Sequence, residues 1–132
     1  MLTTDGCVFQ WGDMICVKEE EIGVRELSFV SGSDMRKERI IQIACGEAHA
    51  LALTSKGQVY SWGSNGEGQL GIGDDIFLTG QPTQVSGVNE FHPRIAQIAC
   101  GDWTSFALDK EGSVSRCGLI CYSFYQLKCT FH

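Results

Sequence analysis

An internal repeat constrains this chain more than any other feature of its sequence. The segment RIIQIACG at 39–46 returns as RIAQIACG at 94–101, with seven of eight positions identical and an offset of 55 residues. A second pattern, GQVYSWG at 57–63, is preceded by GCVFQWG at 6–12 and followed by GSVSRCG at 112–118. Self-similarity at such a period is the signature of a repeat architecture, in which each unit packs on its neighbours.

Each unit is predicted to consist of short strands. Apolar, partly alternating runs occupy 40–44, 48–53 and 58–62, and Gly57 and Gly112 end turns that lead into the following strand. Short strands that recur at a period of ~50 residues are typical of propeller blades, each too small to bury its own face alone. The expected fold class is therefore all-β, with four-stranded antiparallel blades.

The glycine-rich loop and its flanks carry a resemblance to a known family. Residues 62–71 have the sequence WGSNGEGQLG, Pro82 and Val85 follow, and Ala-Cys-Gly at 99–101 completes the pattern. This combination resembles the repeat of the regulator of chromosome condensation family, whose members are usually seven-bladed β-propellers. The resemblance covers residues 5–118 and implies a partial β-propeller, with two repeats and the start of a third.

The resemblance also implies how the chain is divided. Residues 1–54 are expected to form a first repeat with a divergent outer loop, 55–109 a second repeat, and 110–118 the start of a third. The apolar tail at 119–132 matches nothing in the repeat, and we expect it to mark a truncated isoform or a gene-model error. The structural motif positions are Trp11, Gly12, Gly46, Gly57, Trp62, Gly63, Gly68, Gln69, Leu70, Gly71, Pro82 and Gly101.

Two departures from the family pattern stand out. After Trp11 and Gly12, the first repeat lacks the Asn-x-x-Gly-Gln-Leu-Gly segment and the proline. In the third repeat, Cys117 stands where the tryptophan would be. The segment 81–85 of the second repeat is expected to lead the chain back towards the core.

Composition excludes several classes of protein. Ten Lys and Arg against 16 Asp and Glu give a formal charge of −6, which argues against a direct nucleic-acid partner. No apolar run approaches the ~20 residues that span a bilayer, and residues 1–6 resemble no signal peptide. Seven cysteines in such a chain are expected to be reduced thiols. We therefore expect an intracellular protein, cytoplasmic or nuclear, with no membrane partner.

No motif predicts catalysis, a cofactor or a metal. The GEGQLG segment at 66–71 fits the dinucleotide-binding spacing, but an acidic turn rather than a helix follows it. The acidic residues of this loop lack the spacing of a calcium site. Three cysteines and His132 near the end of the chain match no zinc spacing. No Ser or Cys has a recognisable triad spacing.

Four residues at equivalent loop positions are candidates for partner binding: Glu47, His49, Asp102 and Trp103. For His49 a structural role is favoured, as a hydrogen bond that pins adjacent strands. Cys45 and Cys100 end equivalent apolar strands and are expected to be packed, inert thiols.

The resemblance implies two classes of function. The first is a protein–protein interaction module or scaffold, and the second is a guanine-nucleotide exchange factor for a small Ran-like GTPase. Exchange needs a whole face of a complete propeller, so the interaction module is favoured and the chain is not expected to be an enzyme. Exposed blade edges would also allow self-association.

Overall fold

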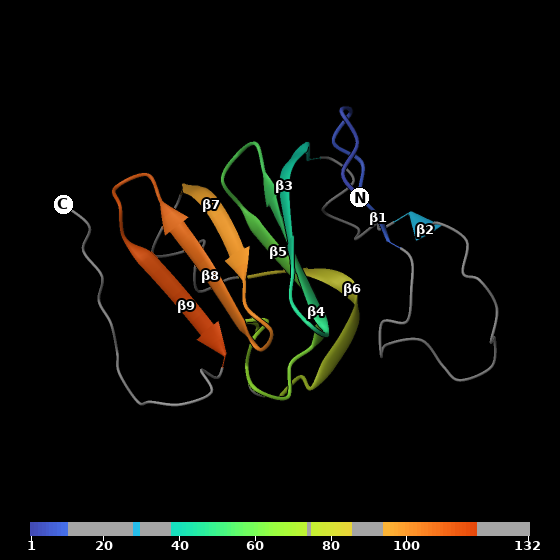
Figure 1. Cartoon of the computed structure of the whole chain (residues 1–132), viewed down its shortest axis with the longest axis vertical. Coiled ribbons are helices and arrows are strands. Elements are labelled where there is room, and N and C mark those ends of the chain that lie inside the picture. Colours follow the sequence, from blue (N-terminus) through green and yellow to red (C-terminus); the bar gives the residue numbers. More distant parts are fainter. Residues whose placement is uncertain (11–27, 30–37, 74, 86–93, 119–132) are drawn as a thin grey trace.

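The computed structural model of the chain describes residues 1–10, 28–29, 38–73, 75–85 and 94–118. They form three antiparallel sheets that lie side by side, with the largest in the middle (Figure 1). The all-β class with an antiparallel four-stranded blade is thereby confirmed. No helix in this part of the chain is long and apolar enough to cross a membrane. Trp11, Gly12 and the tail at 119–132 lie outside the described residues.

The strands follow one another in chain order within each sheet. The smallest sheet pairs β1 (Phe9–Gln10) with β2 (Ser28–Phe29). The middle sheet contains β3 (Ile40–Cys45), β4 (His49–Thr54), β5 (Val59–Ser64) and β6 (Leu78–Gln84). The third sheet contains β7 (Ile95–Cys100), β8 (Thr104–Asp109) and β9 (Val114–Gly118).

The two larger sheets share the pairing of their first two strands. The register shifts between Ile40 and Gln42 where β3 pairs with β4, and between Ile95 and Gln97 where β7 pairs with β8. These two irregularities lie at equivalent positions of the sequence repeat. The repeat therefore recurs in the backbone geometry, including a local bulge.

The outer strand of the middle sheet contains a proline. The sequence predicts only a return path at 81–85, whereas the structure forms a strand, β6, that pairs with β5 from Leu78 onward. Pro82 has no N–H to donate to a ladder, so it is tolerated only at an edge or an irregularity. Strand β6 provides both, because it is an edge strand of the middle sheet and its register shifts opposite the step from Ser61 to Gly63.

Strand β4 is buried on both faces, which explains its nearly continuous apolar sequence. Ala50 and Ala52 pack in a cluster with Val8 from the N-terminal segment. Leu51 and Leu53 pack in a second cluster with residues of β7 and β8. Because successive side chains of a strand point to opposite faces, β4 contributes to both hydrophobic cores.

The turns that lead into β1, β5 and β9 are closed in the same way. A side-chain oxygen of Thr3, Thr54 or Asp109 accepts a hydrogen bond from the main-chain N–H four residues later, at 3.0, 3.1 and 2.8 Å. Three residues after each acceptor stands a glycine with a left-handed backbone, which other residues adopt only with strain. These are Gly6, Gly57 and Gly112, with φ of 83°, 84° and 88°.

One side chain joins the first strands of the two larger sheets, β3 and β7, which we call the inner strands. Gln42 Nε2 donates to the carbonyl of Ile98 at 2.8 Å, and its Oε1 accepts from the N–H of Ile98 at 3.0 Å. The Gln42 amide thus satisfies both main-chain groups of one residue, as a neighbouring strand would. Gln97, one repeat later, is exposed.

The turn of each sheet contacts the start of the next inner strand. A Cβ on Gly57 would lie 2.9 Å from Arg94 Cα, and a Cβ on Gly6 would lie 2.7 Å from Arg39 Cγ. The N–H of Ile95 also donates to the carbonyl of Gly57 at 3.2 Å. The same contact at one-repeat spacing makes the stacking of the sheets regular.

We expect Gln42→Ala to lower the free energy of unfolding by about 1–3 kcal/mol, because the N–H and carbonyl of Ile98 lose their partner. Chemical denaturation followed by circular dichroism measures the effect. The matched control is Gln97→Ala, which removes the equivalent but exposed amide and should change stability little. Equal effects of the two substitutions would contradict this role of Gln42.

Candidate partner-binding site

Three loops lie at one end of the two larger sheets, the lower end in Figure 1. They are the β3–β4 loop at 46–48, the β7–β8 loop at 101–103 and the β5–β6 loop, described at 65–73 and 75–77. The N–H of Glu47 donates to the carbonyl of Asp102 at 3.1 Å, which ties equivalent loops of neighbouring sheets together. We call these three loops the loop end.

The structure brings three of the four candidate residues to the surface of the loop end. Glu47 and Asp102 are exposed, and Trp103 is 38% exposed. His49 differs, because only 2% of it is exposed. His49 is therefore a support for the loop end, whereas the other three can touch a partner.

The imidazole of His49 packs against Gly46, which in turn lies close to the equivalent glycine of the neighbouring sheet, Gly101. A Cβ on Gly46 would collide with the His49 ring and would lie 2.5 Å from the carbonyl oxygen of Gly101. Neither ring nitrogen forms a well-aligned hydrogen bond with the described residues. Burial lowers the pKa of His49, and the main chain of Thr104 beside the ring offsets part of that change. The ring therefore supports the loop end by packing and by its contact with the main chain of Thr104 in the neighbouring sheet.

The β5–β6 loop is anchored to the neighbouring sheet by its motif residues. Asn65 Oδ1 accepts from the N–H of Leu70 at 2.9 Å, and Asn65 Nδ2 donates to two carbonyls farther along the loop. The carbonyl of Gln69 accepts from the Ser105 hydroxyl of β8 at 2.6 Å. Gln69 and Leu70 are buried, so the motif fixes the loop and leaves its far side free to contact a partner.

Sequence reasoning missed the most exposed apolar residues of this end. Ile76, Phe77 and Leu78 are 40%, 73% and 46% exposed. The signal for them was an apolar run directly after two aspartates, inside a loop where apolar residues have no core to fill.

The loop end is acidic. Its exposed carboxylates in the described residues are Glu47, Glu67, Asp75 and Asp102. The described residues of the three loops include no lysine or arginine. Exposed aromatic side chains that lie among carboxylates, with no lysine or arginine in the described loops, suit a partner that presents basic and apolar groups.

A cavity of about 280 Å³ opens beside the β3–β4 loop. Its walls are mainly apolar and include Val8, Ile43 and Trp62, with Glu47 and His49 at the loop side. The Trp62 indole N–H donates to Gln10 Oε1 at 3.0 Å, so this cavity lies between the first and the middle sheet.

The structure offers no support for nucleotide or metal chemistry in the described residues. The GEGQLG segment forms turns there, and the helix that a dinucleotide site needs does not follow it. Among the described residues, no group of three or more His, Cys, Asp or Glu could hold a metal ion. Cys121, Cys129 and His132 lie outside them.

Of the two strand-end cysteines, Cys100 agrees with the prediction of a packed, inert thiol and Cys45 does not. Cys45 is exposed, so it is not a packed thiol. Cys100 is half-buried, and burial, with a smaller contribution from the nearby Cys45, raises its pKa to about 12. The difference arises because the middle sheet packs against Cys100, whereas no described element covers Cys45.

Comparison with known proteins identifies the family. The model named "Regulator of chromosome condensation (RCC1) repeat" matches residues 56–108, and a second model of the same description matches residues 40–69. The chain belongs to the RCC1 repeat family. The partial β-propeller is likewise confirmed by solved RCC1-type structures. The chain superposes on Prp20p of Saccharomyces cerevisiae with a TM-score of 0.71 and 26% identity, over 89% of this chain and 30% of that chain.

Curated relatives have the same repeat in longer chains. Human E3 ubiquitin-protein ligase HERC2 is 37% identical over 86% of this chain, which corresponds to 2% of HERC2. The human "RCC1-like G exchanging factor-like protein" is 35% identical over 61% of this chain and 18% of that protein. The chain thus spans less than a third of the proteins that it matches here.

The unusual Cys117 of this RCC1-type chain reduces one contact between sheets. Trp62, its equivalent in the middle sheet, is 3% exposed and fills the boundary with the first sheet. Cys117 lies against Gly71 and Val85, and a cavity of about 20 Å³ remains beside it. Burial raises the pKa of the Cys117 thiol. The boundary between the middle and the third sheet is therefore less tightly packed than the boundary that Trp62 fills.

We expect Gly46→Ala to destabilise the protein by about 1–3 kcal/mol, because the new methyl group forces the His49 ring or the Gly101 carbonyl to move. Gly101→Ala is the matched control, since its Cβ would have no neighbour closer than 3.9 Å. Thermal unfolding of the two variants measures the difference. A Gly46→Ala variant as stable as Gly101→Ala would show that the ring is not confined.

Proposed function

We propose that this chain is a protein–protein interaction module that binds a basic protein surface through its loop end. One observation carries the proposal. The hydrogen bond from the main-chain N–H of Glu47 to the main-chain carbonyl of Asp102 holds the acidic loops of two sheets together at one surface. The exposed Trp103 and Phe77 at the same end provide apolar anchors. An intracellular location, cytoplasmic or nuclear, is part of this proposal.

Exposure and burial distinguish the loop residues that would contact a partner from those that would hold the loops in place. Asp102 and Trp103 would contact the partner, because both are exposed on a short loop between two paired strands. His49 and Gln69 would hold the loops in place, because both are buried between the sheets. A rigid surface of this kind loses little conformational entropy on binding.

The solved yeast relative suggests suitable probes. Prp20p of Saccharomyces cerevisiae binds Gsp1p and histones. A histone dimer provides a basic surface, and a small Ran-like GTPase provides a test of the alternative function.

The experiment measures binding of a histone dimer to the wild-type chain and to the Asp102→Asn/Trp103→Ala variant by biolayer interferometry. We expect the variant to bind about tenfold or more weakly, because it loses a charge and an aromatic anchor. The control is Glu111→Gln, which removes an exposed carboxylate at the opposite end and should bind as the wild type does. Equal binding by all three proteins, or no binding by the wild type, would contradict the proposal.

The alternative is regulation of a small GTPase, as an exchange factor without covalent chemistry. It is favoured by the similarity to the "RCC1-like G exchanging factor-like protein". Release of a fluorescent guanine nucleotide from a Ran-like GTPase tests it. Acceleration at a substoichiometric amount of this chain would replace the interaction module with the exchange factor.

A further inference from the structure

A second, chemically different groove lies at the opposite end of the sheets. A cavity of about 500 Å³ opens where the β4–β5 turn meets the start of β7 and the β8–β9 turn. Its lining includes three cationic side chains, Lys56, Arg94 and Lys110, and the apolar Ile41 and Ala96. The pairing of Ile40 with Thr54 places this end a full strand length from the loop end.

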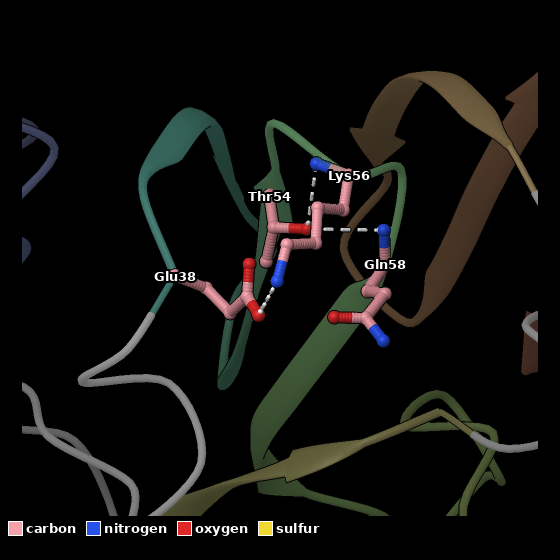
Figure 2. Close-up of polar contacts among 4 residues, drawn as sticks. All are labelled: Glu38, Thr54, Lys56 and Gln58. Atoms are coloured by element: carbon pink, nitrogen blue, oxygen red, sulfur yellow. Dashed lines mark hydrogen bonds and ion pairs between the residues drawn. The ribbon is translucent and has the colours of Figure 1, made fainter.

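Lys56 is already neutralised by a neighbour. Thr54 Oγ1 accepts from the N–H of Lys56 at 3.3 Å and from that of Gln58 at 3.1 Å, which closes the turn that presents Lys56 (Figure 2). Lys56 Nζ then pairs with Glu38 Oε1 at 2.6 Å, and the Glu38 side chain is only 13% exposed. The pair formed by Lys56 and Glu38 therefore carries no net charge.

Arg94 and Lys110 differ from Lys56. Both are exposed, and neither side chain forms a hydrogen bond or an ion pair with the described residues. Their backbones are fixed, because the N–H of Lys110 donates to the carbonyl of Arg94 at 3.2 Å. Glu111 is exposed in the same turn but does not line the groove. Within the described part of the chain, the groove therefore holds two cations that are paired with no carboxylate, on a backbone that is hydrogen-bonded in place.

The main chain of the groove has few hydrogen-bond donors to offer. The N–H groups of Ser55, Gly57, Ile95 and Lys110 all donate to carbonyls of the protein itself. A phosphate is usually held by several free main-chain N–H groups, and this groove does not provide them. Its remaining donors are long, separate cationic side chains, which suit carboxylates that lie along an extended chain.

The apolar wall of the groove restricts the class of ligand further. Ile41 is 50% exposed, and Ala96 is exposed beside the two cations. An apolar side chain of a ligand would cover this surface, which a small inorganic anion would leave in water. We propose that this groove binds an acidic segment of a partner protein, with its carboxylates on Arg94 and Lys110 and an apolar side chain against Ile41 and Ala96.

The test uses a fluorescein-labelled peptide rich in Asp and Glu with one central leucine, and a control peptide with Asn and Gln in place of the acids. We expect the whole chain to bind only the acidic peptide, more weakly at higher salt. Arg94→Gln/Lys110→Gln should weaken binding about tenfold, as expected for loss of two partly solvated ion pairs. Arg116→Gln, which alters an exposed arginine in the middle of β9, is the matched control.

A second variant distinguishes a loss of binding from a loss of folding. Ala96→Asp adds a carboxylate at an exposed groove position and should repel the acidic peptide while the circular dichroism melt stays as in the wild type. Equal binding of both peptides, or an unchanged affinity in Arg94→Gln/Lys110→Gln, would overturn the proposal. Displacement of the acidic peptide by inorganic phosphate at equal concentration would also overturn it. These outcomes are independent of the loop end, because Asp102 and Trp103 are unaltered.

Discussion

The contact between neighbouring inner strands is the constraint on which the rest of this structure depends. Gln42 pairs with both main-chain groups of Ile98, and Gly57 lies on the start of β7. Gly46 lies close to both the His49 ring and the carbonyl oxygen of Gly101. No single sheet could bury both faces of β4, so the hydrophobic core exists only when the sheets are stacked. The polar contacts fix the relative position that the core alone would leave adjustable.

Stacking also creates the two surfaces to which we assign binding. At one end, the loops of two sheets bring carboxylates and exposed aromatic side chains together, and the described residues of these loops include no lysine or arginine. At the other end, the turn of one sheet and the start of β7 form a groove lined by the exposed Arg94 and Lys110. Each surface draws residues from two neighbouring sheets, so binding at either end depends on the same stacking.

Much of the fold could be predicted from the sequence, because the repeat carries its own turn and strand signals. Gly57 and Gly112 mark turns that require a left-handed backbone, and the apolar runs place the strands within a residue or two. The candidate site was predicted only in part. Glu47, Asp102 and Trp103 follow from their equivalent loop positions, but burial of His49 and exposure of Phe77 depend on packing between sheets, which no local pattern records. The division of the chain into repeats stays a prediction.

Amide hydrogen exchange tests the stacking of the sheets most directly. If the contacts between β3 and β7 make the two larger sheets one cooperative unit, the central amides of β4 and β8 should open with the same free energy. Gln42→Ala should then lower the protection of both strands by the same factor, while Gln97→Ala lowers neither. Protection of β4 that stays unchanged in Gln42→Ala while β8 exchanges freely would contradict the account, because the sheets would then fold independently.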